Sequence, residues 1–368
     1  MKVLLTGSSG FIGSNMALWL KRASIDVLYL DKENVSDLAS FIKEADFIIH
    51  LAGINRPLTK EEFYDGNTNL TKQLVDLVKD SGRDIPIIFA SSIQASLDND
   101  YGRSKKLAED YLFKSGLTTY IYRLSNVFGK WCKPNYNSGV STFCYNIAHD
   151  LDITISNRDN IVHLVYIDDI CKTFLDVIEG KIKPSKTTYN IVNPIYDKTL
   201  GYIVDLLYSF KDSRKDLYVP YQDDDFIKKL YSTYLPYLDE SNFIYDLDMH
   251  IDNRGSFSEF IKTNGYGQVS VNVGKPGIVK GNHYHNTKNE KFLVVSGTCS
   301  IKFRKVNTDK VIEYIVSGDK LQVIDIPVGY THSITNIGET DSITIMWANE
   351  PFDKSNPDTY FEEVIKSK

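Results

Sequence analysis

The sequence predicts two folded parts, an α/β domain built on a parallel sheet and an all-β domain after it. Through the first half of the chain, short apolar runs alternate with helical segments, as in Val3–Thr6, Phe11–Leu20 and Asp26–Leu30. This alternation is typical of parallel strands joined by helices. Beyond residue 240 the helical periodicity fades, and the short β-rich runs that follow one another are typical of a sandwich or small barrel.

The remaining elements follow in order. In the first half we expect an amphipathic segment over Val35–Ala45, a strand over Asp46–Gly53, a helix over Asn69–Lys79 and a strand over Pro86–Ser92. The stretch Lys211–Tyr245 is expected to be an amphipathic connector. The β-rich runs of the second half are Gly267–Val273, Lys291–Gly297, Cys299–Val306, Lys310–Val316, Lys320–Ile326 and Ser342–Trp347.

Composition narrows the classes of function. Hydrophobic residues make up 42% and charged residues 24%, and the formal net charge is −6. A mildly acidic chain without basic blocks is a poor match to nucleic acid or to an anionic membrane, and no apolar run approaches the roughly 18 residues of a membrane helix. The N-terminal apolar stretch breaks into Gly and Ser too early for a signal peptide. Four cysteines without a CxxC pair suit a reducing compartment, so we expect a cytoplasmic protein.

A glycine-rich turn indicates a nucleotide site. Gly7, Gly10 and Gly13 follow the first strand and lie at the start of the first helix, where glycines let a pyrophosphate approach the free N–H groups. Asp31 and Lys32 stand at the end of the second strand. An acidic residue there favours NAD by binding the ribose 2′-hydroxyl, whereas a cation favours the 2′-phosphate of NADP. The residues alone therefore leave the choice of cofactor open.

The chemistry expected at this site centres on Tyr101 and Lys105. The two residues are four apart and so share one face of a helix. Lys105 is expected to lower the pKa of Tyr101, which gives a proton to a carbonyl oxygen as a hydride arrives at the carbon. Ser92, at the end of the preceding strand, is expected to hold that oxygen.

Together these motifs resemble the extended short-chain dehydrogenases/reductases over residues 1–240, and the resemblance implies a Rossmann-like sheet. It rests on Thr6–Gly13, His50–Gly53, Ser91–Ser92, Tyr101 with Lys105, Arg123–Gly129 and Tyr166–Asp169. It implies that Arg123 and Asn126 contact a nucleotide sugar. It also implies that the cofactor contacts Gly7, Gly10, Phe11, Ile12, Gly13, Asp31, Lys32, Leu51, Ala52, Tyr101 and Lys105.

Two departures from that family bear on the reaction. The segment from Ser92 to Tyr101 is shorter than is usual, which affects the substrate loop. Members that dehydrate sugars carry Thr-Asp-Glu where this chain has Ser92-Ile93-Gln94. Because the carboxylic acid that expels water is missing, the resemblance implies reduction or epimerisation.

A second group of side chains predicts a metal site in the C-terminal part. His283 and His285 are two apart and so point to the same face of a strand, Glu290 follows after a short turn, and His332 comes from a second strand. Three imidazoles and one carboxylate suit Zn²⁺, with Fe, Mn or Ni as alternatives.

This spacing resembles the motifs of the cupin barrels, and Asp252–Glu259 with Gly277–His283 resembles the nucleotide 4-keto-sugar 3,5-epimerases, which are cupins. The resemblance implies an all-β cupin barrel over residues 241–368. In those epimerases the histidine in the place of His283 is a base and no metal is present. Here His285 and Glu290 add ligands, so we assign His283 to the metal, and Lys280 and Tyr284 are candidates for the base. Arg254 is expected to bind a diphosphate, with an exposed ion pair as its alternative role.

The whole chain resembles a family of bifunctional capsule-biosynthesis enzymes in which a reductase is followed by a cupin. The resemblance runs through Gly129–Asn137, Leu230–Pro236 and Lys288–Gly297. It implies epimerisation at C3 of a UDP-2-acetamido-2,6-dideoxy-4-ketohexose, then NADPH-dependent reduction at C4 to UDP-N-acetyl-L-talosamine, on the route to UDP-N-acetyl-L-fucosamine. It also implies Zn²⁺ and a homodimer.

Several alternatives remain open at this point. NADH is an alternative to NADPH, and other divalent metals to Zn²⁺. The cupin is alternatively a non-catalytic dimerisation module attached to a reductase. The first domain is alternatively a UDP-sugar 4-epimerase that retains its NAD.

Overall fold

The structure is a computed structural model that describes residues 1–185, 187–243, 245–306, 308–355 and 357–366. The chain divides into two compact units, Met1–Tyr208 with Asp225–Asp239 and Ser209–Asp224 with Glu240–Lys368. Among the described residues, no helix has the length and apolar character needed to cross a membrane.

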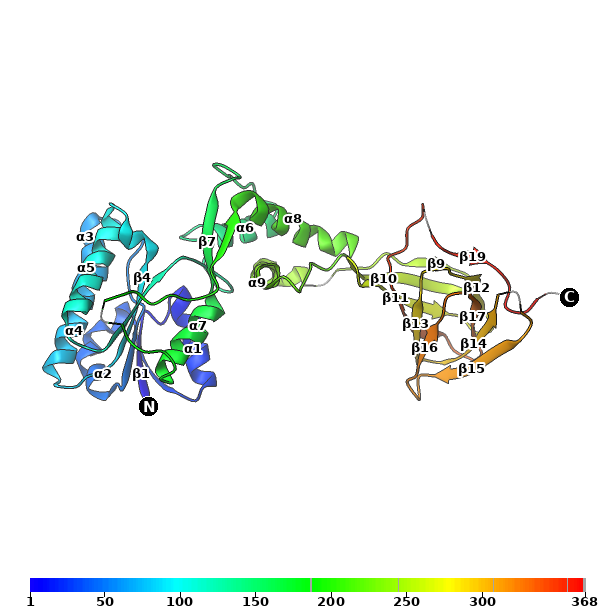
Figure 1. The fold of residues 1–368 in the computed structure, drawn as a ribbon, viewed down its shortest axis with the longest axis horizontal. Coiled ribbons are helices and arrows are strands. Elements are labelled where there is room, and N and C mark those ends of the chain that lie inside the picture. The colour runs from blue at the N-terminus through cyan, green and yellow to red at the C-terminus, as the bar shows by residue number, and fades with distance from the viewer. Residues whose placement is uncertain (186, 244, 307, 356, 367–368) are drawn as a thin grey trace. The chain divides into compact units, whose positions relative to one another are not determined.

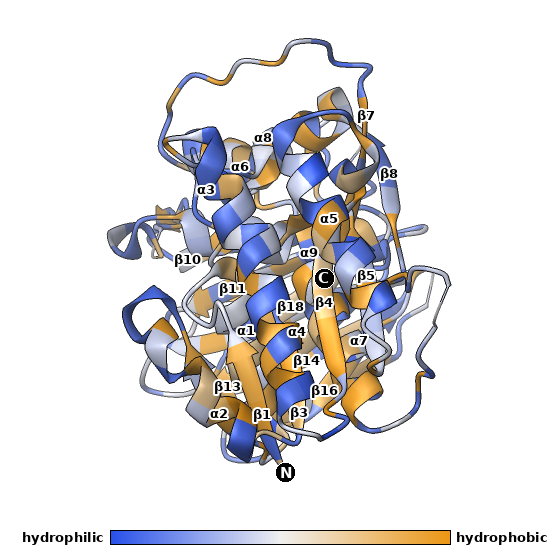
Figure 2. Ribbon diagram, turned by 90° about the vertical axis from the view of Figure 1, so that its left-hand side faces the viewer, coloured by the Kyte–Doolittle hydropathy of each residue, from blue (hydrophilic) through white to orange (hydrophobic). Residues whose placement is uncertain are grey.

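The first unit is built on a five-stranded parallel sheet in the order β2-β1-β3-β4-β5 (Figure 1). Helices α2, α4 and α5 cover one face, and α1 and α7 cover the other. Because both faces are covered, the central strands are continuous apolar runs, and they are orange in Figure 2. The strands are β1 (Lys2–Thr6), β2 (Asp26–Leu30), β3 (Phe47–His50), β4 (Ile87–Ser92) and β5 (Thr119–Leu124). The helices around them are α1 (Phe11–Arg22), α2 (Leu38–Glu44), α3 (Lys60–Phe63), α4 (Leu70–Asp80), α5 (Asp100–Lys114) and α7 (Ile167–Ile178).

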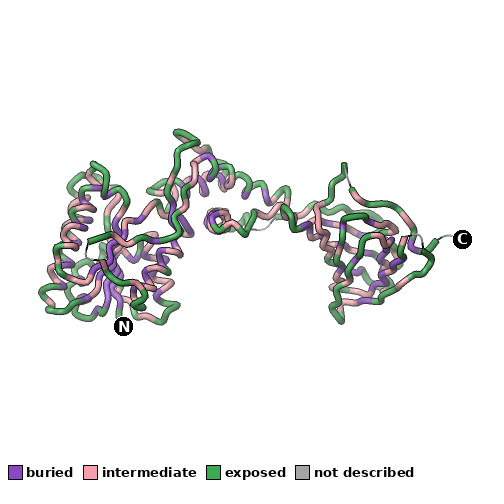
Figure 3. Tube along the Cα trace, in the orientation of Figure 1, coloured by how far each residue is buried: buried purple, intermediate pink, exposed green. Residues whose placement is uncertain are grey.

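Short helical turns and a small second sheet complete this unit. The sheet has the order β6-β7-β8, with β6 parallel and β8 antiparallel to β7. Its strands and the remaining helices are β6 (Asn126–Phe128), β7 (Ile161–Tyr166), β8 (Tyr196–Thr199), α6 (Gly139–Ala148), α8 (Leu200–Asp216) and α9 (Asp225–Tyr234). The short turns of this unit are η1 (Lys32–Asp37), η2 (Tyr64–Asn69), η3 (Ile93–Ser96) and η4 (Leu235–Tyr237), whereas η5 (Glu240–Asn242) and the part of α8 from Ser209 on belong to the second unit. The buried stretches in Figure 3 concentrate in the large sheet, where β1, β3 and β4 end next to one another.

The second unit consists of two antiparallel sheets, in the orders β16-β13-β18-β11-β10-β9 and β15-β14-β17-β12-β19. Its apolar core includes Phe292, Ile301 and Phe303. The strands are β9 (His250–Asp252), β10 (Gly255–Thr263), β11 (Gly267–Gly274), β12 (Val279–Tyr284), β13 (Glu290–Ser296), β14 (Thr298–Lys305), β15 (Val311–Ser317), β16 (Val323–Ile326), β17 (Tyr330–Asn336), β18 (Ser342–Ala348) and β19 (Tyr360–Phe361). The predicted fold class, a parallel α/β sheet followed by an all-β barrel, is confirmed.

The division of the chain differs from the expected boundary after residue 240 in one segment. Residues 209–224 were expected in the first domain, but they belong to the second compact unit. The reason is backbone pairing, because Val219 donates to the carbonyl of Lys262 and Lys262 donates to that of Leu217, both at 2.8 Å. The connector thus adds an edge to the β domain, which its amphipathic pattern did not reveal.

Candidate functional site

The glycine turn between β1 and α1 is shaped for close backbone approach. Gly7 has φ +69°, and a Cβ there would lie 2.8 Å from the backbone of Ala52. A Cβ on Gly13 would lie 2.1 Å from the carbonyl oxygen of Gly7. Gly10 caps α1 without any side-chain hydrogen bond, so the first N–H groups of this helix are free to bind an anion.

The other residues predicted to bind the cofactor lie around this turn. Phe11 and Ile12 form the first positions of α1, and Leu51 and Ala52 directly follow β3. The N–H of Ala52 donates to the hydroxyl of Thr6 at 3.1 Å, which holds the end of β3 against the end of β1. The local geometry therefore fits a dinucleotide whose pyrophosphate lies over the start of α1.

Asp31 is bound to the glycine turn itself. Its carboxylate accepts the Ser8 hydroxyl at 2.5 Å, the Ser9 hydroxyl at 2.9 Å and the Ser9 N–H at 3.1 Å. Burial tends to raise the pKa of Asp31, but these hydrogen bonds outweigh it and lower the pKa. Both carboxylate oxygens are thus engaged within the chain, whereas Lys32 is exposed beside them.

Tyr101, Ser92 and Lys105 come together where β4 meets α5. Asn99 caps α5 by accepting the N–H of Gly102 at 2.7 Å, which fixes the first turn that carries Tyr101. Burial raises the pKa of Tyr101, and a hydrogen bond with Ser92 partly offsets the rise. The structure thus brings together the residues that the sequence predicted for proton transfer.

The surroundings of Lys105 bear on its predicted effect on the pKa of Tyr101. Its amine is buried and donates to the carbonyl of Ala90 at 3.1 Å. Burial lowers the pKa of Lys105 to about 8, although the charge of Glu109 raises it. Burial raises the pKa of Tyr101, and the hydrogen bond with Ser92 offsets only part of the rise. The net direction is thus opposite to the lowering expected from Lys105, because desolvation is the largest effect at both groups.

Arg123, predicted to contact the substrate, forms an ion pair with Glu109. Its Nε and Nη2 donate to the buried carboxylate of Glu109 at 2.9 and 2.6 Å. Nη2 also donates to the hydroxyl of Tyr189, and Nη1 to that of Ser96, both at 2.7 Å. Three partners within the chain thus hold Arg123 in place, and Arg123 and the exposed Asn126 both stay candidates for contact with the substrate.

Asn67 is a buried side chain near Lys105 that the sequence reasoning did not single out. It is 1% exposed in η2, which is a π-helical turn, a feature that is frequent at functional sites. Its amide exchanges hydrogen bonds with the backbone of Ile54 and donates to the hydroxyl of Ser104 at 3.0 Å. A Cβ on Gly53 would lie 2.6 Å from Asn67 and 3.1 Å from the amine of Lys105, so Asn67 lines the same space. No periodicity in the sequence marks a π-turn.

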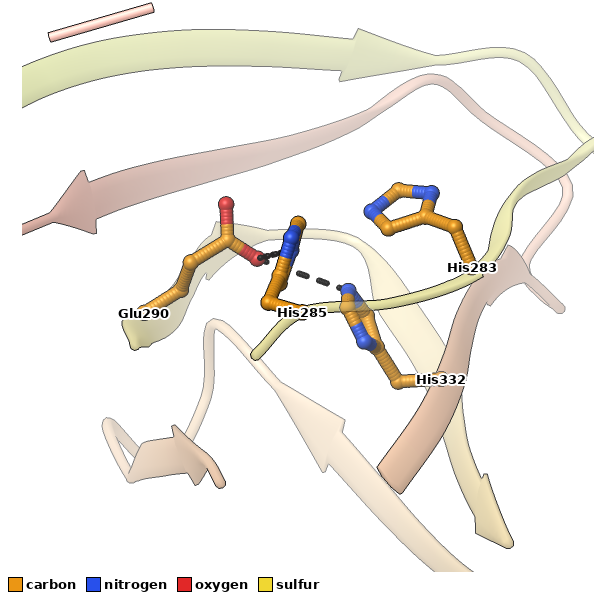
Figure 4. A group of neighbouring side chains, drawn as sticks. All are labelled: His283, His285, Glu290 and His332. Carbon is orange, nitrogen blue, oxygen red and sulfur yellow. Dashed lines mark hydrogen bonds and ion pairs between the residues drawn. The ribbon is translucent and has the colours of Figure 1, made fainter. Parts of the chain in front are cut away.

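In the second unit, the four predicted metal ligands form one cluster (Figure 4). His283 lies on β12, His285 directly after it, Glu290 at the start of β13 and His332 on β17. Their donor atoms all lie within 4.8 Å of one another. His285 and His332 are paired with the Glu290 carboxylate at 3.3 and 3.4 Å.

The electrostatics of the cluster suit a divalent cation. Burial opposes ionisation of Glu290, but hydrogen bonds from His285 and His332 hold the pKa of Glu290 well below its usual range. Burial lowers the pKa of His283 to about 4, assisted by the two other rings. An ionised carboxylate together with three imidazole rings is a donor set that Zn²⁺ accepts, so the residues fit the predicted ion.

A cavity of about 300 Å³ lies over the cluster. Lys280 lines it, and its amine donates to Asn272 at 2.7 Å and to the carbonyl of Val273 at 2.8 Å. Burial lowers the pKa of Lys280. Tyr284, the other candidate base, stacks on Tyr360 and is absent from the cavity wall. The remaining lining residues include the cation Arg254, the imidazole of His250 and the apolar Phe257, Phe292, Ile334 and Met346.

Arg254 forms the ion pair that was the alternative role considered for it, and it also borders the cavity. Its Nε and Nη2 donate to Asp252 at 2.9 and 2.6 Å, which is the exposed ion pair. The same side chain lines the cavity above the metal ligands. A cation at this position is suited to an anionic substrate group.

Comparison with known families shows to which protein family the chain belongs. Residues 3–191 match the NAD dependent epimerase/dehydratase family, and residues 250–360 match the polysaccharide biosynthesis C-terminal domain. The chain belongs to the NAD-dependent epimerase/dehydratase family. This member of the family thus carries a nicotinamide-cofactor domain, which confirms the predicted reductase-type enzyme.

Relatives of this epimerase/dehydratase family member include full-length matches. It is 45% identical over 366 residues to UDP-2-acetamido-2,6-beta-L-arabino-hexul-4-ose reductase from Pseudomonas aeruginosa, covering 98% of each chain. The crystal structure of the capsular polysaccharide assembling protein CapF from Staphylococcus aureus matches 99% of this chain and 100% of its own, with 50% identity and a TM-score of 0.93. A Thermotoga maritima UDP-glucose 4-epimerase structure shares the fold of 64% of this chain, covering 98% of its own at 18% identity and a TM-score of 0.53. The resemblance to a reductase fused to a cupin is confirmed.

Proposed function

We propose that the chain is a bifunctional nucleotide-sugar enzyme of polysaccharide biosynthesis. The cupin cavity epimerises C3 of UDP-2-acetamido-2,6-dideoxy-4-ketohexose, and the reductase site reduces the C4 ketone with NADPH to UDP-N-acetyl-L-talosamine. The observation that carries the proposal is that one chain holds both a Ser92–Tyr101–Lys105 group and a cavity bordered by His283 and Glu290 of the four-residue metal-ligand cluster. The name of the Pseudomonas relative, a UDP-hexulose reductase, supports the substrate class.

The residues of the reductase site supply the proton that the reduction of the ketone requires. Nicotinamide, when bound, supplies the hydride. Tyr101 is the proton donor to the C4 oxygen, and burial keeps its phenol protonated at neutral pH. Ser92 bonds to Tyr101 and orients the oxygen, and Lys105, one helical turn after Tyr101, supplies the cation of the site. The NADP form is supported by Lys32, since Asp31 is engaged by Ser8 and Ser9.

The cupin cavity is suited to proton exchange next to a ketone. His283, His285, Glu290 and His332 would hold the divalent ion, for which we propose Zn²⁺, and the ion, when bound, supplies Lewis-acid stabilisation of an enolate. Lys280 lines the cavity and, because burial lowers its pKa, is the group we assign to proton transfer. Arg254 supports binding of the diphosphate at the cavity wall.

The test follows both steps on the UDP-4-keto sugar. Without NADPH, NMR in deuterated water is expected to show deuterium entering C3. When NADPH is added, its absorbance is expected to fall in proportion to substrate. NADPH consumption without exchange at C3 would contradict the epimerase and favour a cupin that only mediates dimerisation. Tightly bound NAD with no net NADPH consumption would favour the redox-neutral 4-epimerase.

The pH dependence of the reduction reports the charge of Lys105. We expect kcat/KM to fall as pH rises through about 8, because burial lowers the pKa of Lys105 to that value and the cation is lost above it. Glu109 raises this pKa, so Glu109→Gln should move the alkaline limb to lower pH. Asp110→Asn, on the same helix but paired with Lys106, is the control. If the fall of kcat/KM at alkaline pH occurs at the same pH in Glu109→Gln, Lys105 is ruled out as the group that causes it.

The exposed lysine beside the glycine turn should decide the cofactor preference. Lys32→Ala is expected to raise KM for NADPH about tenfold and leave KM for NADH unchanged, because only NADPH carries the 2′-phosphate. Lys43→Ala, an exposed lysine on α2, is the matched control. Equal effects on both cofactors would contradict this role of Lys32.

A homodimer is supported by the outer face of the six-stranded sheet. The inner face of β11 and β18 is polar and buried, as at Asn272 and Thr344. The outer face instead presents a cross-strand apolar row. Its members, paired across neighbouring strands, are Val271, Ile345, Leu293 and Val323. An apolar face of this kind is typical of a protein interface.

Association should fail when this row is charged. Ile345 is 38% exposed. The substitution Ile345→Glu is expected to convert a dimer of the 41.9 kDa chain into a monomer, because a carboxylate cannot be desolvated in the interface. Light scattering after gel filtration measures the mass. Ile161→Glu, an exposed isoleucine of the first unit, should leave the dimer intact. A monomeric unmodified chain would contradict the homodimer.

A further inference from the structure

The C-terminal segment of the chain lies along the metal-ligand strand. We call residues 357–366 the C-terminal strap. Within it, β19 pairs with the end of β12, placing Phe361 opposite His283 and Tyr360 opposite Tyr284. The N–H groups of Glu362 and Val364 donate to the backbone and side-chain oxygens of Asn282, at 2.9 and 3.2 Å. The strap is therefore an edge of the sheet that carries His283 and His332.

A buried arginine anchors the far end of the strap. Arg304 is 1% exposed, and its guanidinium donates to the carbonyls of Val364 and Glu363 at 2.9 and 2.6 Å. It also pairs with the carboxylate of Glu362 at 2.7 Å. Since a buried guanidinium must keep its partners, this end of the strap is held firmly against the barrel.

Asp358, near the start of the strap, contacts the metal-ligand loop through two different groups. Its backbone carbonyl accepts a hydrogen bond from Nδ1 of His285 at 2.7 Å, although the two residues are 73 positions apart in the sequence. Its carboxylate accepts the N–H groups of Asn286, Thr287 and Lys288 at 3.1, 2.8 and 2.9 Å and the Thr287 hydroxyl at 3.0 Å. Asp358 has φ +37°, a left-handed conformation that Asp tolerates better than most residues.

These contacts hold a short loop that has a metal ligand at each end. Residues 286–289 join His285 to Glu290, so fixing the loop fixes the separation of two ligands. A histidine that donates Nδ1–H to a carbonyl keeps its Nε2 lone pair for a metal. In the structure Nε2 of His285 hydrogen-bonds to the Glu290 carboxylate at 3.3 Å, so this nitrogen points at the other ligand, as a shared ion requires.

We propose that Asp358 is a positioning residue of the metal centre and that the C-terminal strap is its outer shell. The proposal rests on the metal site of the proposed function. Asp358 touches no reacting atom. It orients His285 through the carbonyl and holds the loop to Glu290 through the carboxylate, so the last residues of the chain set the affinity for the ion. Lys288 assists by donating to the carbonyl of Pro357 at 2.9 Å.

The test is the affinity of the full-length protein for Zn²⁺, measured by competition with a chromophoric chelator. Asp358→Ala is expected to raise the dissociation constant about 10–100-fold, the range typical of outer-shell partners. Asp358→Asn keeps an acceptor for the loop and should restore most of the affinity. The absorption spectrum of the Co²⁺-substituted protein should shift in Asp358→Ala, because His285 changes orientation.

Asp309→Ala is the matched control. Its carboxylate also binds the strap, through Lys366 at 2.7 Å, but at an exposed position away from the ligands. It should bind Zn²⁺ within about twofold of the unmodified chain. A dissociation constant of Asp358→Ala within the same twofold range would overturn the proposal. If Asp358→Ala does not fold, Lys288→Met serves instead, and an unchanged dissociation constant there overturns it. Failure of the unmodified chain to bind one Zn²⁺ would refute the proposed metal site itself.

Discussion

Tyr101→Phe is expected to lower kcat for NADPH oxidation by about 10²–10⁴-fold, the range that a positioned proton donor contributes. The phenol of Tyr101 is the group we assign to protonating the C4 oxygen, and its pKa is raised by burial, so it is a proton donor at neutral pH. The ring itself packs against Phe63 at 5.8 Å between centroids, a contact that Phe retains. The loss should therefore fall on the chemistry and spare the fold.

The measurement separates the two reactions of the chain. In Tyr101→Phe the absorbance of NADPH should hardly change, while deuterium exchange at C3 continues at the rate of the unmodified protein. Tyr111→Phe is the matched control, since Tyr111 lies on the same helix and its hydroxyl bonds to Asp76 at 2.5 Å instead. NADPH oxidation in Tyr101→Phe within about tenfold of normal would exclude Tyr101 as the donor.

Glu290→Gln is expected to abolish exchange at C3 and to weaken Zn²⁺ binding by more than about 100-fold, beyond the loss typical of an outer-shell residue. Glu290 is the only anion among the four donors, and its pKa lies well below the usual range despite burial, because His285 and His332 bond to it. Gln has nearly the same shape but no charge. The effect should therefore report the lost charge, with little change in packing.

Glu313→Gln is the matched control for this substitution. Glu313 lies in the same unit on β15 and bonds to Ser300, away from the ligands. It should keep both Zn²⁺ and exchange at C3. Binding of NADPH, measured by fluorescence, should be normal in both variants because the glycine turn belongs to the other unit. A Glu290→Gln protein that still binds Zn²⁺ and exchanges C3 would remove Glu290 from the metal site.

The structure also qualifies two predictions made from residue types. Arg123 has the right charge for a substrate phosphate, but Glu109, Tyr189 and Ser96 take up its donors. Lys105 was expected to lower the pKa of Tyr101, yet burial governs both groups. Charge and spacing can be read from a sequence. The occupation of a donor and the degree of desolvation depend on neighbours that only the folded chain supplies.

The sequence by itself determined the features that depend on short stretches of chain. The alternation of apolar runs predicted the parallel sheet, Gly7, Gly10 and Gly13 marked the anion-binding turn, and the spacing of the histidines predicted one face of a strand. These signals are local because backbone geometry repeats over a few residues. Glycine is required at Gly13, for example, because a Cβ there would meet the preceding turn.

Only the tertiary structure decided which distant segments support the sites. Asp358 reaches His285 across 73 residues, and Asp31 reaches Ser8 across 23, with no motif to connect either pair. Residues 209–224 join the β unit through backbone bonds to Lys262, although their amphipathic pattern is that of a connector. Backbone hydrogen bonds and carbonyl acceptors leave no trace in residue types, since every residue carries them. Such contacts therefore become visible only when the chain has folded.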